Sequence, residues 1–120
     1  MTVTLFEPKK IGREEWRCIF RITGLGKPIE TYATGDDSLH ALTIAIEGAR
    51  VHLERYGDSL TWFGGEVGEH GLPRPVPSGF GVKVERHLAR LVEEEVTRLV
   101  VAKRKRAARK LTARAKVRRA

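Results

Sequence analysis

The sequence has a single cysteine, Cys18, among its 120 residues. No disulfide can form within the chain, and one cysteine cannot build a structural zinc site. A lone thiol of this kind is typical of proteins that fold in a reducing compartment, and we therefore expect a cytoplasmic protein.

Long apolar runs are also missing. A membrane-spanning helix needs about 20 consecutive apolar residues, whereas the apolar runs of this chain are only a few residues long. The N-terminus, MTVTLFEPKK, lacks the basic region and apolar stretch of a secretory signal. With 41% hydrophobic and 32% charged residues, the composition predicts a globular domain without a membrane span or signal peptide.

Acidic residues are absent from the C-terminal end, because every Asp and Glu lies at or before Glu95. Residues 1–95 contain 12 Lys and Arg against 15 Asp and Glu, a net charge of −3. Residues 96–120 contain 11 Lys and Arg and no acid, a net charge of +11. This segregation predicts a folded domain over residues 1–101 and a basic helical tail over residues 102–120.

Alternating apolar and polar residues predict strands in the first third of the chain. In EWRCIFRIT, Trp16, Cys18, Phe20 and Ile22 recur at every second position, the pattern of a strand with one buried face. Residues 2–7 and 29–34 also favour strands, with Pro8 and residues 9–12 breaking the first. The short Gly-rich connection after Ile22 predicts antiparallel pairing.

A helix is expected over residues 37–56, with Asp36 or Asp37 as its N-terminal cap. Large apolar residues recur there at helical spacing and define one face. LTWF at residues 60–63 favours a short strand, residues 64–81 are rich in Gly and Pro and predict a loop, and helical periodicity resumes at Val82.

We therefore predict an α+β fold in which a three- to four-stranded, mainly antiparallel sheet packs on two helices and a basic helical extension follows. The apolar sheet face is expected to meet side chains from both helices. The expected partners are Trp16, Cys18, Phe20 and Ile22 on the sheet and Leu42, Ile46, Leu53 and Leu88 on the helices.

The basic tail is the strongest functional signal. On a helix its charges would surround the rod, which suits phosphate contacts with a polyanion and not base readout. An acidic protein surface, a solvated tail, and nuclear import by residues 103–106 are the other interpretations. The candidate nucleic-acid-binding residues are Lys103, Arg104, Lys105, Arg106, Arg109, Lys110, Arg114, Lys116, Arg118 and Arg119.

Other chemistry has weak support in the sequence. Glu66, Glu69 and His70 are acid–base residues within a polar loop, and no orienting third group is evident. No pair of histidines has the i, i+4 spacing of a helical metal site. We therefore predict no catalytic residue, metal or cofactor. Arg17 and Arg21 could extend a basic surface on the sheet, and Trp16, Phe20 and Tyr32 could stack bases, although the apolar alternation favours core positions for Trp16 and Phe20.

Several landmarks together resemble a family of small uncharacterised bacterial domains. They are Trp16-Arg17-Cys18, then Gly35-Asp36-Asp37-Ser38-Leu39-His40-Ala41-Leu42, then Leu60-Thr61-Trp62, then Gly71-Leu72-Pro73. The resemblance covers about residues 14–80 and implies a bacterial or phage origin and a cytoplasmic setting, with no mechanism. The basic extension after Val101 departs from the family pattern.

The sequence thus predicts a non-enzymatic protein whose basic C-terminal helix binds RNA, DNA or a ribonucleoprotein. The alternative is an interaction or inhibitory protein, of the phage–host or toxin–antitoxin type. Such a protein would act through its sheet face or through the loop at residues 64–81.

Overall fold

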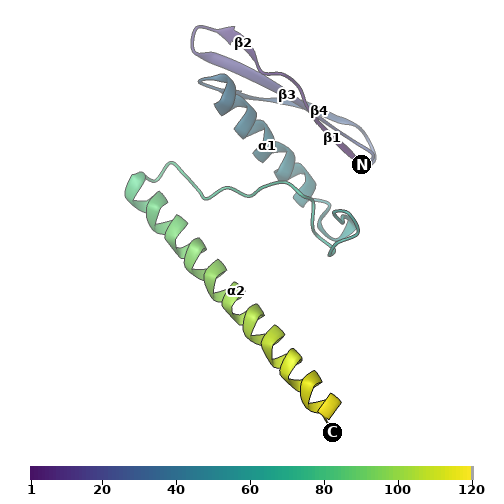
Figure 1. Cartoon of the computed structure of the whole chain (residues 1–120). Coiled ribbons are helices and arrows are strands. Elements are labelled where there is room, and N and C mark those ends of the chain that lie inside the picture. The colour runs from purple at the N-terminus through teal and green to yellow at the C-terminus, as the bar shows by residue number, and fades with distance from the viewer. Residues whose placement is uncertain (120) are drawn as a thin grey trace. The chain divides into compact units, whose positions relative to one another are not determined.

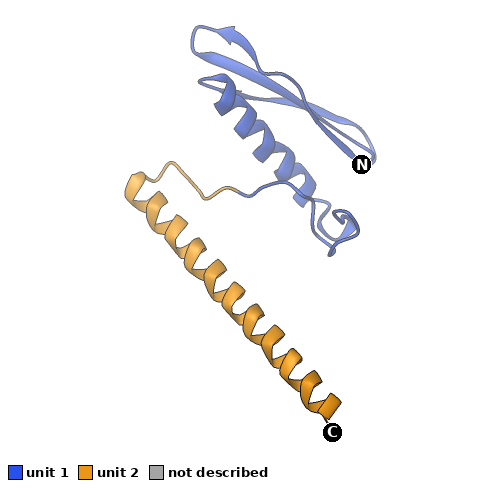
Figure 2. Ribbon diagram, in the orientation of Figure 1, with its two compact units in different colours: residues 1–74 blue, residues 75–120 orange. Residues whose placement is uncertain are grey.

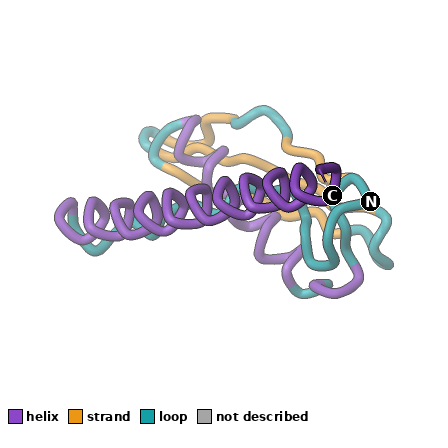
Figure 3. The backbone as a smooth tube through the Cα atoms, turned by 60° about the horizontal axis from the view of Figure 1, so that its bottom comes forward, coloured by secondary structure: helices purple, strands orange, loops and turns teal. Residues whose placement is uncertain are grey.

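The computed structural model describes residues 1–119 and contains four strands and two α-helices (Figure 1). The chain divides into two compact units, of which the first is Met1–Arg74 and the second begins at Pro75 (Figure 2). Helix α2, Val82–Arg119, is uninterrupted (Figure 3), so the expected boundary between residues 101 and 102 falls inside it.

The first unit contains the antiparallel sheet, formed by β1 (Thr2–Leu5), β2 (Lys9–Gly12), β3 (Glu15–Thr23) and β4 (Ile29–Gly35). Strand β4 pairs with most of the length of β3. Strands β1 and β2 also pair with β3, and because a strand has only two edges they share the one opposite β4. The predicted antiparallel sheet and the α+β class are confirmed.

The prediction that residues 9–12 only break the first strand is wrong, because they form β2. Lys9 lies opposite Arg17 and Lys10 opposite Trp16, with an irregularity before Gly12. The segment has too few apolar residues to show a strand pattern, and its place in the sheet comes from backbone pairing with β3. Pro8 separates β2 from β1, in keeping with the confinement of proline to sheet edges.

Helix α1, Ser38–Glu54, follows β4 and lies along one face of the sheet (Figure 1). Asp37 is the cap, since its Oδ1 accepts a hydrogen bond of 2.7 Å from the His40 backbone N–H. The predicted helix and its aspartate cap are confirmed, and the helix ends two residues earlier than expected.

The core of the first unit joins the predicted sheet face to a face of α1 that overlaps the predicted one only in part. Cys18, Phe20 and Ile22 are almost fully buried, as expected. The helix meets them through small residues and through the predicted Leu53. The predicted Leu42 packs against this core but is only partly buried, and Ile46 is partly buried outside the core cluster. The fully buried residues of α1 are Ala41, Ala45, Ala49 and Leu53.

Close approach of helix and sheet explains this choice of face. A Cβ added to Gly48 would lie 3.1 Å from the Phe20 ring, and one added to Gly35 would lie 2.4 Å from the Ala41 nitrogen. A side chain at Gly48 would crowd the Phe20 ring, and one at Gly35 would collide with the backbone at the start of α1. Alanine and glycine therefore occupy the contact, and the larger residues flank it. The burial of Phe20 therefore depends on the small residues of α1.

The remaining elements correct two expectations. Residues 60–63 are not a strand: they form a turn, in which Phe63 adopts φ 46° and packs edge-on against Trp62. Leu88, expected on the sheet face, belongs to the second unit, and the core cluster of the first unit consists of residues between Cys18 and Leu60. Residues 64–81 contain no helix or strand, which confirms the predicted loop.

Candidate nucleic-acid interface

The ten predicted binding residues all lie on the last part of α2, residues 103–119, here called the basic segment. Every residue of this segment is exposed, and none is acidic. The structure therefore brings the ten cations together on one continuous helix. Along the helix axis the segment extends for about 26 Å, at about 1.5 Å per residue.

The cations of the basic segment surround the helix. Each residue turns the helix by about 100°, so Lys103 and Arg114 point to one side while Lys105, Arg109 and Lys116 point away from it. Roughly half of the ten charges can face one partner at a time. Because residues 103–119 are helical, the cations form a rod charged on all sides and not a narrow basic stripe.

Local chemistry favours a helix in the basic segment despite its charge. Alanine, lysine and arginine are all good helix formers, and they make up most of the segment. Thr112, a weaker helix former, is accommodated within the helix by donating its hydroxyl to the Ala108 carbonyl at 3.0 Å. Cations in the last turn, Lys116, Arg118 and Arg119, also oppose the negative end of the helix dipole.

In the preceding part of α2, residues 82–102, a basic side chain pairs with an acidic one. Arg98 donates through Nε to Glu95 at 3.0 Å, and a second donation from its Nη2 makes the ion pair bidentate. The hydrogen bond from Arg98 lowers the pKa of Glu95 below its ordinary value, and the same contact raises the pKa of Arg98. This part of the helix contains both acidic and basic residues, whereas the basic segment has cations alone.

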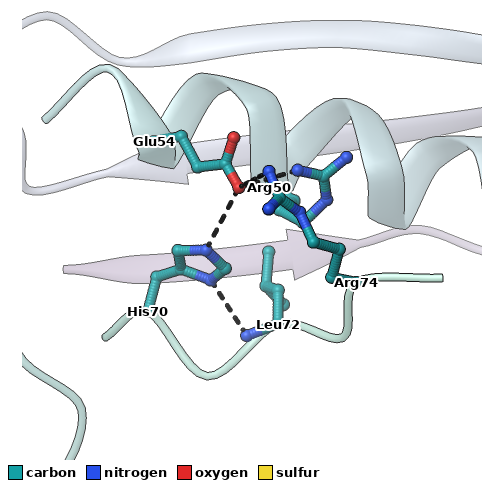
Figure 4. Close-up of polar contacts among 5 residues, drawn as sticks. All are labelled: Arg50, Glu54, His70, Leu72 and Arg74. Carbon is teal, nitrogen blue, oxygen red and sulfur yellow. Dashed lines mark hydrogen bonds and ion pairs between the residues drawn. The ribbon is translucent and has the colours of Figure 1, made fainter. Parts of the chain in front are cut away.

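The loop residues considered for catalysis do not converge. Glu66 and Glu69 are exposed, and His70 lies against α1. The Leu72 N–H donates to His70 Nδ1 at 3.1 Å, while His70 Nε2 lies 3.8 Å from Glu54 Oε1 (Figure 4). Both ring nitrogens therefore face groups that hold the loop in place.

Glu54 is the centre of this contact. Its Oε1 accepts from Arg50 at 2.7 Å and from Arg74 at 3.3 Å (Figure 4). The hydrogen bond from Arg50 lowers the pKa of Glu54 below its ordinary value, with Arg74 and His70 adding to the effect. The Glu54 cluster, consisting of Arg50, Glu54, His70 and Arg74, ties the end of the first unit to α1. The i, i+4 spacing of Arg50 and Glu54 is the signal in the sequence that could have revealed it.

The exposed sheet face presents a second set of cations. Phe20 is 2% exposed and Trp16 is partly buried, so neither is an exposed base platform, as the alternation predicted. Tyr32 is exposed, and the Arg17 guanidinium carbon lies 4.0 Å from its ring centroid. Sequence reasoning missed Lys9 as a neighbour of Arg17, because this neighbourhood depends on the pairing of β2 with β3.

Two further features are absent from the part of the chain that the structure describes. Among residues 1–119, no three His, Cys, Asp or Glu side chains are placed to hold a metal ion. None of the helices in the same range combines the length and the apolar character needed to cross a membrane.

A family model for a domain of unknown function, DUF6968, matches residues 1–74. The chain belongs to this family. The predicted resemblance to an uncharacterised domain family is thereby confirmed. No curated protein and no solved structure matches the chain. The DUF6968 match and the first compact unit both end at Arg74, so the basic segment lies outside the matched residues.

Proposed function

We propose that this protein is a non-enzymatic binding protein whose basic segment engages RNA, DNA or a ribonucleoprotein through phosphate contacts. The observation that carries the proposal is the run of ten exposed cations, without an acid, on one helix. Charge of one sign at this density repels itself, and an opposing polyanion relieves that repulsion.

The dimensions of the basic segment suit a nucleic acid. Along its length of about 26 Å, duplex DNA presents about 15 phosphate charges, at one per 1.7 Å. If about five of the ten cations face the duplex, binding releases counterions and the logarithm of the binding constant falls with the logarithm of salt concentration with a slope of about −4.5.

The side-chain types favour backbone contacts over base readout. Arginine binds phosphate through two parallel hydrogen-bond donors, and lysine contributes a point charge. Asparagine and glutamine, which read adenine edges, are missing from the whole sequence. We therefore propose weak dependence on base sequence. The non-enzymatic role is supported by His70, whose ring nitrogens already face Leu72 and Glu54.

The proposed setting is the cytoplasm of a bacterium. The free thiol of Cys18, which is buried and is the single cysteine of the chain, supports a reducing compartment such as the cytoplasm. The bacterial origin rests on the resemblance of the sequence landmarks alone.

The test is fluorescence anisotropy with labelled duplex and single-stranded oligonucleotides over a series of salt concentrations. The variant replaces Lys103, Arg104, Lys105 and Arg106 with glutamine. Its matched control replaces four exposed cations of the first unit, Lys10, Arg13, Lys27 and Arg55, in the same way.

We expect the basic-segment variant to lose affinity by more than tenfold and its salt slope to fall by about 2, since about half of the four charges contact phosphate. The control variant should bind almost as the unmodified chain does. A chain ending at Val101 should lose most of its affinity. Equal losses in the variant and its control, or binding that is independent of salt, would overturn the proposal.

A protein partner is the second candidate function, and the exposed face of the sheet favours it. Three large hydrophobic side chains, Phe6, Ile19 and Tyr32, are 37–51% exposed on a surface that also carries Arg17 and Arg21. Arginine and tyrosine around an apolar centre are typical of binding hot spots.

A further inference from the structure

The face of the sheet that points away from α1 contains a groove of about 580 Å³, here called the sheet groove. Phe6, Ile11 and Ile19 provide its apolar lining. A volume of this size accommodates one large side chain together with a neighbouring polar group. All of the lining residues belong to the first unit, within the part of the chain that matches DUF6968.

Two cations of the sheet groove oppose each other without an acidic partner. Lys9 and Arg17 are directly opposite across β2 and β3. Like charges in that position destabilise a sheet. Among the described residues, neither cation has a carboxylate within 4.0 Å, whereas Arg21 on the same face pairs with Glu30. The fold itself does not use this pair, and an anion placed between the two would relieve their repulsion.

Arg17 is held in place for such a contact. Its guanidinium lies over the Tyr32 ring, with 4.0 Å from its central carbon to the ring centroid. Its Nε is buried and has no hydrogen-bond partner among residues 1–119. A guanidinium fixed by stacking loses less freedom on binding, and its fork of donors matches a carboxylate.

The charge of the sheet groove favours a peptide over a polyanion. Lys9, Arg17 and Arg21 are balanced in part by Glu7 and Glu30, leaving a net charge of +1 on the lining. Two carboxylates in the groove would repel a chain of phosphates, yet they tolerate a segment with a single negative charge. The Tyr32 ring is already covered by Arg17, and the Arg21 guanidinium carbon lies 5.3 Å from the centroid of the Phe6 ring. The aliphatic side chains of Ile11 and Ile19 do not offer a stacking surface for bases.

We propose that the sheet groove binds a peptide segment of a partner protein in which one carboxylate side chain, Asp or Glu, adjoins a bulky apolar side chain. The carboxylate contacts Arg17 and Lys9, and the apolar side chain lies on Phe6, Ile11 and Ile19. This inference rests on the second candidate function and is independent of the basic segment.

The test is selection from a phage-displayed library of random peptides on the immobilised full-length chain. The basic segment attracts acidic peptides too, so the library is first depleted on a full-length variant carrying Lys9→Ala and Arg17→Lys, which retains that segment. We expect the remaining peptides to share an Asp or Glu beside a leucine or an aromatic residue. Failure to enrich any such peptide would overturn the proposal.

A synthetic peptide with the selected consensus is then titrated into the isotope-labelled chain and followed by NMR. Amide shifts should concentrate on β2 and β3. Lys9→Ala and Arg17→Lys should each weaken binding by about tenfold, through loss of a charge-assisted contact. The matched control is Lys10→Ala, which removes the same charge from the same strand at a position outside the groove lining, and it should leave the affinity unchanged.

Two results of the titration would overturn the assignment. One is equal weakening by Lys9→Ala and Lys10→Ala, which would indicate a general effect of charge. The other is displacement of the peptide from β2 and β3 by a single-stranded oligonucleotide, which would assign the groove to nucleic acid. Loss of oligonucleotide binding in the basic-segment variant bears on the first proposal alone, so the two proposals can fail separately.

Discussion

The first 74 residues bury nine hydrophobic side chains in one core, whereas the 38 residues of α2 bury none. The first unit has 9 Lys and Arg against 11 Asp and Glu, while the chain from Pro75 onward has 14 against 4. Packing therefore accounts for the structure of the first unit, and local helix propensity together with charge accounts for α2. A substitution should therefore act through side-chain packing in the first unit and through helix propensity or charge in α2.

The largest difference in stability between the two regions is expected when the same charged residue is placed in each helix. Ala45→Asp buries an unpaired carboxylate at a position that is 0% exposed, and it should destabilise the first unit by about 3–5 kcal/mol. The matched change in α2, Ala107→Asp, lies at an exposed position and should alter the same transition by less than about 0.5 kcal/mol. Thermal unfolding followed by circular dichroism measures both.

Ile46→Asp, beside Ala45, refines the result. Ile46 lies on the face that periodicity chose and is only partly buried, so the change should cost less than Ala45→Asp. A larger loss from Ile46→Asp would show that the large-residue face of α1, and not the small-residue face, meets the sheet.

A smaller effect is expected from Glu54→Gln. The lowered pKa of Glu54 means that the folded state favours its ionised form, relative to an ordinary value of 4.5. This contribution to stability is present above the unfolded pKa and disappears as pH falls through the folded pKa. The variant should therefore melt below the unmodified chain at neutral pH, and the two curves should converge in acid. Glu93→Gln in α2 is the control. If the melting temperatures of the Glu54→Gln variant and the unmodified chain do not converge in acid, the stabilising role of ionised Glu54 is contradicted.

The smallest effect is expected from ending the chain at Arg74. Because the core cluster and the partly buried side chains packed on it lie between Val3 and Leu72, the shortened chain should retain a cooperative thermal transition. The midpoint should change little. A non-cooperative melt, observed by near-UV circular dichroism and calorimetry, would show that the first unit needs residues beyond Arg74.

The elements with strong periodicity could be predicted from the sequence. Strand β3 follows from alternation between Trp16 and Ile22, and α1 follows from its apolar spacing and the Asp37 cap. Strand β2 could not be predicted, because backbone pairing with β3 determines it and the residues Lys9–Gly12 carry almost no hydrophobic pattern. Trp62 and Phe63 are aromatic residues of the kind that favours strands. The segment nevertheless forms a turn, in which Phe63 has a positive φ and the two rings pack edge-on.

The face of α1 that meets the sheet could be predicted only in part, for a physical reason. Counting large apolar residues selects the side with Leu42 and Ile46, but the distance between helix and sheet selects the side with Ala41, Ala45 and Gly48. The ten cations of the candidate interface could be named from composition. The neighbours Lys9 and Arg17 of the sheet groove required the register of β2 against β3, which sequence alone did not provide.

The buried thiol of Cys18 gives this protein an internal reporter. Its Sγ lies 3.3 Å from the Phe6 carbonyl, and burial raises the pKa of the thiol. An alkylating reagent needs an accessible thiolate, so Cys18 should react only when the sheet and α1 separate. The labelling rate therefore measures opening of the first unit alone, and a change that acts only on α2 should leave it unaltered.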